Sequence, residues 1–419
     1  MSHLGARITR RRLLQMAGMA GLPAFYGGFQ ARAAPLHKKV KITDVKVMLV
    51  RGVNFIHPMV KIETDAGISG IGESYWGGGI KDLMLTYMKR AIVGEDPLQI
   101  ERLYTKMIAQ SSGAGSTAGA TVTAVSGVEI ALWDLAGKIL GAPVYELLGG
   151  KYRDSVRAYW TAGPRGSDAD AMKRWADSIR SHPYGFTAFK IDFRRNADPH
   201  EMSVARSTSR HLSTADLKMN ERYYTAVRDA LGDGYEFSVH CHWELDLPDA
   251  LALARAVAPS RPWWLEDPMP PDYSDSWVRL AQASPVPILT GENLYTRHGF
   301  KPFIVNGGVH LIQIDIPKAG GLLESKKIAD LADIYYLPVC AHNVASPLGT
   351  IASAHCAASI RNFKAHESAA ISADWPKMVE SGPVIKDGRI QLFDKPGLGV
   401  ELNEDWVRSR LAPGEQWWG

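Results

Sequence analysis

From Lys41 to Ile71, hydrophobic and polar residues alternate, first in ITDVKVMLVRG and then in MVKIETDAGISGI. A period of two is typical of β-strands that bury one face. Asp65-Ala66-Gly67 separates two of the apolar runs and predicts a turn between strands. The pattern therefore predicts an antiparallel sheet.

Residues 81–148 change to a helical spacing of apolar positions, which ends in SGVEIALWDLAGKILGAPVYELLGG. Gly141 and Pro143 are expected to end one helix before a short second one. Together with the sheet, these helices predict an α+β capping domain over residues 40–153.

After Arg153, short β-rich runs alternate with helical stretches. The runs end near eight positions: Trp160, Lys190, His240, Glu266, Glu292, Asp315, His342 and Glu367. From His240 onward these positions are 26, 26, 23, 27 and 25 residues apart, and one strand, loop and helix need about that length. The α/β fold predicted is a (β/α)₈ barrel over residues 154–374, followed by a C-terminal segment, 375–419, that packs on the cap.

The first 33 residues contain five arginines and no acidic residue. Residues 9–15 read TRRRLLQ, residues 13–29 are moderately apolar, and Ala31-Arg32-Ala33 offers small residues for cleavage. This stretch resembles a twin-arginine signal peptide, which implies the twin-arginine export machinery and a periplasmic location. The apolar run is too short and too rich in glycine for a permanent membrane anchor. A plain basic tail is the alternative.

Without residues 1–33 the formal charge falls from +4 to +4 − 5 = −1. A nearly neutral chain has no general attraction for nucleic acid. Only three cysteines are present, Cys241, Cys340 and Cys356, so we expect buried thiols rather than a disulfide framework.

Nearly every predicted barrel strand ends in an ionisable residue, and barrel enzymes carry their catalytic groups at this end of the strands. Side chains two apart on a strand face the same way, so Lys190 accompanies Asp192 and His240 accompanies His242. A single carboxylate at a strand end is normally just solvated. Seven strand ends in phase with the repeat predict an active site.

Glu266 (in WWLEDPMPP) and Glu292 (in PILTGENLY) belong to adjacent strands, and their carboxylates would repel without a cation between them. We therefore expect one divalent metal ion. Lys190 and His342 come from strands on opposite sides of the barrel, which places a proton-transfer group on each face of a molecule held by the metal. Asp315 can accept the second imidazole N–H of His342, which makes the histidine a proton acceptor with a partner that orients it.

Two long stretches resemble signatures of the mandelate racemase and muconate lactonizing enzyme family, within the enolase superfamily. Residues 124–149, AVSGVEIALWDLAGKILGAPVYELLG, resemble the first signature, and residues 237–268 resemble the second. The resemblance extends from about residue 40 to the C-terminus. It implies the same cap and barrel, a homo-oligomer, and cap loops near residues 54–57 and 75–79 that close over the site.

The resemblance also implies that a proton is removed beside the carboxylate of a small-molecule substrate, with Mg²⁺ stabilising an ene-diolate. The roles it implies are metal ligation by Glu266 and Glu292, a base dyad of His342 and Asp315, a second-strand group at Lys190, and a hydrogen bond from Glu367 to the substrate. We expect Lys190 to be catalytic and Asp192, on the same face of the strand, to bind the substrate.

Two positions depart from the family pattern. His240 stands where the third metal ligand is usually Asp, and because imidazole suits Mn²⁺, Fe²⁺ or Zn²⁺ better than Mg²⁺, these metals are alternatives. The motif Lys190-Ile191-Asp192 lacks the second lysine that racemases of the family use as a base.

His242 is similar to the histidine that helps a β-hydroxyl leave in galactonate dehydratase-like members, although a structural histidine is the alternative. We therefore expect dehydration of an aldonate or aldarate to a 2-keto-3-deoxy acid. An epimerase, racemase or cycloisomerase is a second hypothesis. A periplasmic binding protein, in which His240 marks the loss of metal chemistry, is a third.

Overall fold

The computed structural model describes residues 39–112, 117–196, 210–369, 374–381 and 384–418. The predicted signal peptide, residues 1–33, lies outside the described residues, so export stays a prediction. Within the described ranges, no helix is both long enough and apolar enough to cross a membrane.

The N-terminal domain contains an antiparallel sheet of three strands in the order β1-β2-β3. Its strands are β1 (Ile42–Arg51), β2 (Ile56–Thr64) and β3 (Ser69–Glu73). Its helices are α2 (Ile80–Leu83), a π-helix (Met84–Met88), α3 (Lys89–Ile92), α4 (Ile100–Ser112), α5 (Gly119–Leu140) and α6 (Val144–Leu147). The sheet and the turn between β2 and β3 are as the alternating pattern predicted, and the capping domain is confirmed.

The long helix α5 lies very close to β3, because glycines face it. A Cβ atom on Gly72 would lie 2.5 Å from the carbonyl oxygen of Gly127, and one on Gly70 would lie 2.3 Å from that of Ala131. Gly141 ends α5 in the left-handed conformation, with φ of 69°, which glycine adopts without steric cost.

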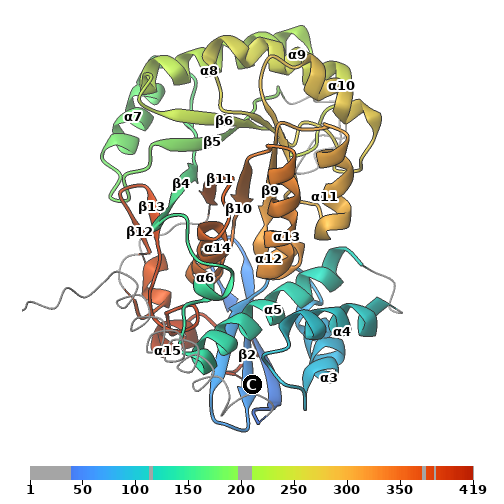
Figure 1. Ribbon diagram of the computed structural model, residues 1–419. Helices are drawn as coiled ribbons and strands as arrows, with labels where there is room; N and C mark the ends of the chain where they lie inside the picture. Colours follow the sequence, from blue (N-terminus) through green and yellow to red (C-terminus); the bar gives the residue numbers. More distant parts are fainter. Residues whose placement is uncertain (1–38, 113–116, 197–209, 370–373, 382–383, 419) are drawn as a thin grey trace, which may run out of the picture.

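The second domain is a closed parallel barrel, which confirms the predicted fold (Figure 1). Its strands, neighbours in chain order with β11 pairing back to β4, are β4 (Ser155–Thr161), β5 (Ala188–Asp192), β6 (Glu236–His240), β7 (Leu265–Glu266), β8 (Ile288–Thr290), β9 (Leu311–Asp315), β10 (Val339–His342) and β11 (Phe363–Ser368). The helices around it are α7 (Ala169–Arg180), α8 (Thr214–Leu231), α9 (Leu247–Val257), α10 (Asp275–Ala283), α11 (Thr296–Val305), α12 (Ile316–Ala319), α13 (Gly321–Ile334) and α14 (Pro347–Ala358), with a 3₁₀ turn at Ala258–Ser260.

Side chains fill part of the barrel interior, so it is a packed core and not a pore. Tyr159 and Trp264 meet edge to face with ring centres 5.7 Å apart, and Gln313 donates a hydrogen bond to the Tyr159 hydroxyl. All three cysteines are buried and free, as expected.

The C-terminal segment contacts both domains. It contains a 3₁₀ turn (Trp375–Met378), β12 (Ile385–Lys386), β13 (Arg389–Gln391) and α15 (Glu404–Arg408). β13 pairs antiparallel with β4 of the barrel, whereas the amide of Ala412 donates to the carbonyl of Leu49 in the cap. The sequence pattern had indicated the cap contact alone.

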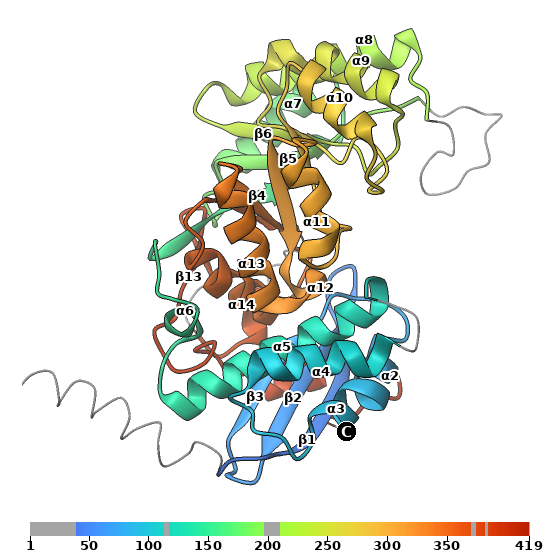
Figure 2. The same cartoon turned by 45° about the vertical axis from the view of Figure 1, so that its right-hand side comes forward.

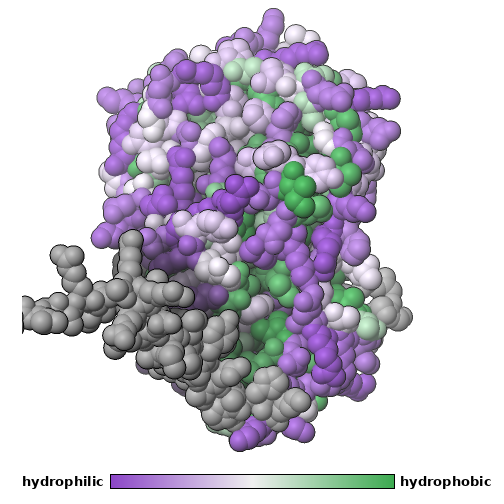
Figure 3. All heavy atoms as spheres, in the orientation of Figure 1, coloured by the Kyte–Doolittle hydropathy of each residue, from purple (hydrophilic) through white to green (hydrophobic). Residues whose placement is uncertain are grey.

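Figures 1 and 2 show the cap below the barrel, with α5 beside α12 and α13 at the boundary. On the face seen in Figure 3, hydrophilic residues predominate, and smaller groups of apolar residues lie over both the barrel and the cap.

Two buried glutamates of the cap accept hydrogen bonds from the N-termini of barrel helices. Glu73 accepts from the amides of Ser346 and Gly349 at α14, both at 2.8 Å. Glu129 accepts from the amides of Leu322 (2.8 Å) and Leu323 (3.0 Å) at α13. These amides have no partner inside their own helix, and the helix dipole favours an anion there. The two carboxylates therefore fix the cap to the barrel.

We predict that Glu73→Gln destabilises the protein by about 1–3 kcal/mol, because both carboxylate oxygens accept main-chain N–H groups and an amide NH₂ would leave one of these groups unpaired. The measurement is the free energy of unfolding in urea. Glu404→Gln, at an exposed position on α15, is the matched control and should change it by less than about 0.5 kcal/mol. Equal unfolding midpoints for the two variants would contradict the structural role of Glu73.

Candidate active site

The register of the barrel strands brings the predicted residues together. Asp192 on β5 is paired with His240 on β6, and His240 is paired in turn with Glu266 on β7. On the other side, Asp315 on β9 is paired with His342 on β10. Because parallel strands end at the same mouth, these side chains meet although they are far apart in the sequence.

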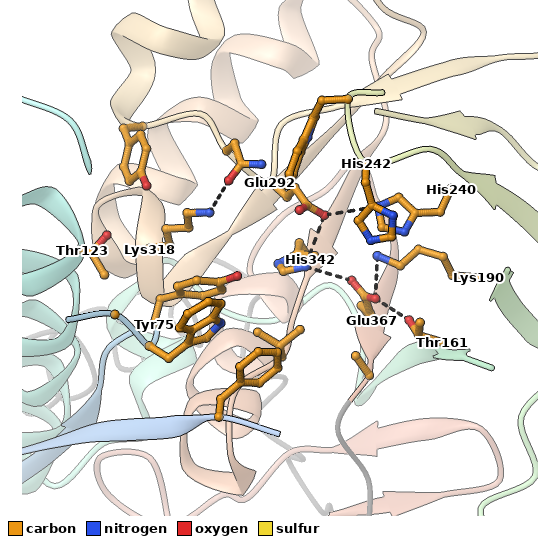
Figure 4. A pocket seen from close by; sticks show the side chains of 18 of the residues that line it. Tyr75, Thr123, Thr161, Lys190, His240, His242, Glu292, Lys318, His342 and Glu367 are labelled. Atoms are coloured by element: carbon orange, nitrogen blue, oxygen red, sulfur yellow. Dashed lines mark hydrogen bonds and ion pairs between the residues drawn. The ribbon is translucent and has the colours of Figure 1, made fainter. Parts of the chain in front are cut away.

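A cavity of about 710 Å³ opens at this mouth. Seven of the nine predicted site residues line it: Lys190, Asp192, His240, His242, Glu292, His342 and Glu367. All of these except Asp192 are labelled in Figure 4. The other two, Glu266 and Asp315, are buried behind the wall and contact the lining residues Lys190 and His342 respectively.

His240, Glu266 and Glu292 form a candidate metal-binding triad, since one ligand atom from each lies within 4.8 Å of the others. The Nε2 atom of His240 lies 3.9 Å from Glu266 Oε1 and 3.8 Å from Glu292 Oε2. Burial raises the pKa of Glu292 well above its ordinary value, and the carboxylate of Asp267 adds to this effect. Among the described residues, no donor is hydrogen-bonded to Glu292 Oε2. Glu292 therefore lies in a site that favours added positive charge, and one imidazole nitrogen together with two buried carboxylates is a ligand set that fits a divalent cation.

Lys190 is held between two carboxylates. Its Nζ atom lies 2.8 Å from Glu266 Oε1 and 2.6 Å from Glu367 Oε1. Burial by itself would lower the pKa of Lys190, but these two carboxylates raise it well above the ordinary value. The side chain is therefore a fixed ammonium group, and Glu367 also accepts a hydrogen bond from the hydroxyl of Thr161.

His342 and Asp315 form a close pair, with Nδ1 2.6 Å from Oδ2. The other ring nitrogen, Nε2, lies 3.3 Å from Glu292 Oε2 and 3.7 Å from Glu367 Oε2. Burial lowers the pKa of His342 well below its ordinary value, so the ring is neutral and Nε2 can accept a proton. Asp315 then orients the ring and stabilises its protonated form.

His242 lies against His240, with ring centres 3.5 Å apart. It has a positive φ of 52°, and Trp243 follows with 65°. Residues other than glycine adopt this conformation at a cost of about 1–3 kcal/mol each and retain it where the surroundings impose it. The amide of Trp243 donates to the carbonyl of Asp267 at 2.6 Å, which helps to hold His242 at the cavity.

The sequence pattern did not single out Lys318, which also lines the cavity. Its Nζ atom donates to Asn293 Oδ1 at 2.6 Å and lies 4.5 Å from the centre of the Tyr75 ring. Burial lowers the pKa of Lys318, while the carboxylate of Asp315 acts in the opposite direction. The available signal was its position three residues after Asp315, directly beyond a strand end.

Tyr75 and Trp76, which follow β3 in a loop of the cap, line the cavity as well, together with Phe55 from the preceding cap loop. Phe55 and Trp76 are stacked with ring centres 4.8 Å apart. Both cap segments that the family resemblance implied therefore reach the mouth of the barrel.

Comparison with known proteins agrees with this geometry. The family model "Mandelate racemase / muconate lactonizing enzyme, N-terminal domain" matches residues 42–149, and the model "Enolase C-terminal domain-like" matches residues 171–406. A D-xylonate dehydratase from Haloferax volcanii is 39% identical over 380 residues, which are 90% of this chain and 90% of the relative. A D-galactonate dehydratase from Pectobacterium atrosepticum is 33% identical over 370 residues, 84% of this chain and 91% of the relative.

Solved structures give the same result. A mandelate racemase/muconate lactonizing enzyme-like protein from Rubrobacter xylanophilus superposes with a TM-score of 0.83 at 35% identity, covering 90% of this chain and 99% of that one. A putative dehydratase from Salmonella enterica superposes with a TM-score of 0.79 at 31% identity, covering 89% and 99%. With both domains matched, the chain belongs to the mandelate racemase and muconate lactonizing enzyme family of the enolase superfamily.

Proposed function

We propose that this protein is a metal-dependent dehydratase, which removes water from a sugar acid to give a 2-keto-3-deoxy acid. One observation carries the proposal: a histidine with a carboxylate behind it, His342 with Asp315, shares a cavity with a second histidine, His242, and with the metal triad. In Figure 4, His342 and His242 lie on two sides of the Glu292 carboxylate. The relatives named as dehydratases of xylonate and galactonate support the same reaction class.

His240, Glu266 and Glu292 are the residues that would hold the metal. When bound, a divalent cation supplies positive charge to the substrate carboxylate and so makes the adjacent proton more acidic. Mg²⁺ is the metal typical of the family, whereas the imidazole of His240 favours Mn²⁺, Fe²⁺ or Zn²⁺.

The protein's own groups then move two protons. His342 Nε2 accepts the proton from the carbon beside the carboxylate, and Asp315 stabilises the imidazolium that results. His242 donates a proton to the hydroxyl on the next carbon, so the C–O bond breaks and water leaves. The remaining enol becomes the 2-keto acid by taking up a proton at the carbon that lost the hydroxyl.

The positive groups of the cavity bind the substrate's oxygens. Lys190 lies beside the metal triad and, together with Glu367, orients the carboxylate end of the substrate. Asp192 lines the cavity on the same side as Lys190. Lys318, on the opposite side of His342 from Lys190 in Figure 4, donates a hydrogen bond to a further oxygen. Asp192 occupies the position where racemases of the family have their second lysine. Because no lysine stands there to return a proton to the substrate carbon from the face opposite His342, dehydration is favoured over racemisation.

The first test is product formation. Metal-loaded protein should convert at least one of D-xylonate, D-galactonate and galactarate to a 2-keto-3-deoxy acid, measured with semicarbazide. His342→Asn should lower kcat by about 10²- to 10⁴-fold, because it removes the general base. His298→Asn, at an exposed position on α11, is the control and should retain full activity. No product from a broad set of aldonates and aldarates, with metal bound, would refute the proposal.

The second test separates the acid from the base. His242→Asn should lower elimination by at least about 10²-fold. Deuterium from D₂O should still enter the substrate beside the carboxylate, because His342 and Asp315 are intact, and NMR detects this exchange. If the variant keeps its metal but loses exchange and elimination together, His242 is not the proton donor.

The third test concerns Lys318. A charge-assisted hydrogen bond contributes about 1.5–3 kcal/mol, and one factor of ten corresponds to about 1.4 kcal/mol. Lys318→Met should therefore lower kcat/KM by about 10- to 100-fold. Lys301→Met, on the exposed side of α11, should leave it unchanged. An unaltered kcat/KM in Lys318→Met would show that the ammonium group does not contact the substrate.

A further inference from the structure

We propose that Asp192 is a positioning residue that orients His240 as the third metal ligand. Because the pair provides a nitrogen ligand, we further propose that the site prefers a metal that binds imidazole well, such as Mn²⁺ or Zn²⁺, over Mg²⁺. The inference rests on the metal site of the proposed function. It is independent of the substrate and of the reaction.

The two nitrogens of the His240 ring face different carboxylates. Nδ1 lies 3.0 Å from Asp192 Oδ1, whereas Nε2 points toward Glu266 and Glu292, at 3.9 and 3.8 Å from their oxygens. A carboxylate is an acceptor, so Nδ1 carries the proton and Nε2 keeps its lone pair. Asp192 therefore fixes the tautomer in which Nε2 is the ligand atom.

The barrel positions Asp192 for this role. Asp192 is the last residue of β5 and is paired in register with His240, the last residue of β6. The amide of Phe193 donates to the carbonyl of His240 at 2.9 Å, so the backbones are tied together at this point. The Asp192 side chain is 61% exposed and that of His240 is 4% exposed, which places the carboxylate on the outer side of the ring and the triad on the inner side.

His242 restricts the His240 ring further. Its ring centre is 3.5 Å from that of His240, and its Nδ1 atom lies 3.9 Å from the same Asp192 oxygen. The ring of His240 is thus held on one edge by Asp192 and on one face by His242. Both contacts resist the rotation that would turn Nε2 away from Glu266 and Glu292.

This arrangement explains how a histidine can stand at an aspartate position. Replacing an anionic oxygen ligand with imidazole removes one negative charge from the site and introduces nitrogen, which Mg²⁺ binds poorly. Asp192 restores the negative charge one hydrogen bond away and raises the basicity of the ring. The pair of Asp192 and His240 thus carries the same net charge as the aspartate usual at this position. It binds the metal through nitrogen instead of oxygen, and it therefore differs in metal preference.

The test measures metal affinity of metal-free protein by calorimetry, without substrate, using Mn²⁺, Zn²⁺ and Mg²⁺ separately. The wild type should bind Mn²⁺ and Zn²⁺ more tightly than Mg²⁺. Asp192→Asn should weaken Mn²⁺ and Zn²⁺ binding by about 10- to 100-fold, as loss of a partner behind a ligand does. Asp233→Asn, which changes an aspartate that is 79% exposed, is the control and should have no effect.

A double-mutant cycle distinguishes orientation of the ring from a general charge effect. His240→Asp should shift the preference toward Mg²⁺, and adding Asp192→Asn to it should change Mn²⁺ affinity by less than about threefold. Nitrogen modulation in the electron spin echo of bound Mn²⁺ should be present in the wild type and absent in His240→Asp. If His240→Asp fails to fold, the Asp192→Asn affinities and the wild-type spectrum still test the proposal.

Three outcomes would overturn the inference: tighter binding of Mg²⁺ by the wild type, an equal effect of Asp192→Asn in both backgrounds, or two metal ions per chain. The last would make Asp192, His240 and His242 a second site, since these three also bring ligand atoms together. None of these measurements depends on dehydration, so a failure of the proposed reaction and a failure of this inference are distinguishable.

Discussion

β11 and β4 pair as parallel strands, which joins the last strand of the barrel to the first and pairs Glu367 with Tyr159. This closure brings Glu367 to within 2.6 Å of the Lys190 ammonium, which lies 2.8 Å from Glu266 on its other side. A buried ammonium with two carboxylates is stable only if the geometry is held, because each isolated charge would lose its hydration. The arrangement of charged side chains at the mouth of the barrel therefore depends on closure of the sheet. An open sheet would leave Glu367 without Lys190 as its partner.

The mouth of the barrel around Lys190 contains more buried carboxylates than buried cationic side chains. Lys190 is a single ammonium group between Glu266 and Glu367, and Asp315 is paired with the neutral imidazole of His342. Glu292 has two imidazoles within 3.8 Å, and its raised pKa reflects a charge that burial disfavours. A divalent cation at the triad supplies the positive charge that the side chains lack. The same cation would polarise a substrate carboxylate, so the requirement of the folded site and the requirement of the reaction coincide.

The cap is coupled to this chemistry through the helices that follow the catalytic strands. Glu73 holds the start of α14, close after His342, and Glu129 holds the start of α13, which follows Asp315 and α12. The cap loops with Tyr75 and Phe55 line the side of the cavity that faces the cap. A displacement of the cap would thus move both the cavity wall and the segments next to the base dyad.

The sequence by itself determined the fold class and the residues at the strand ends, because strand alternation, helix spacing and the length of a βα unit are local properties of the chain. It identified Glu266, Glu292 and His342 for the same reason. Only the tertiary structure decided that Lys190 is bound by two carboxylates, that Asp192 faces His240, that Lys318 reaches the cavity, and that the C-terminal hairpin extends the sheet at β4. Each of these contacts joins residues distant in the sequence, and their distances follow from strand register and barrel closure, which no local pattern encodes.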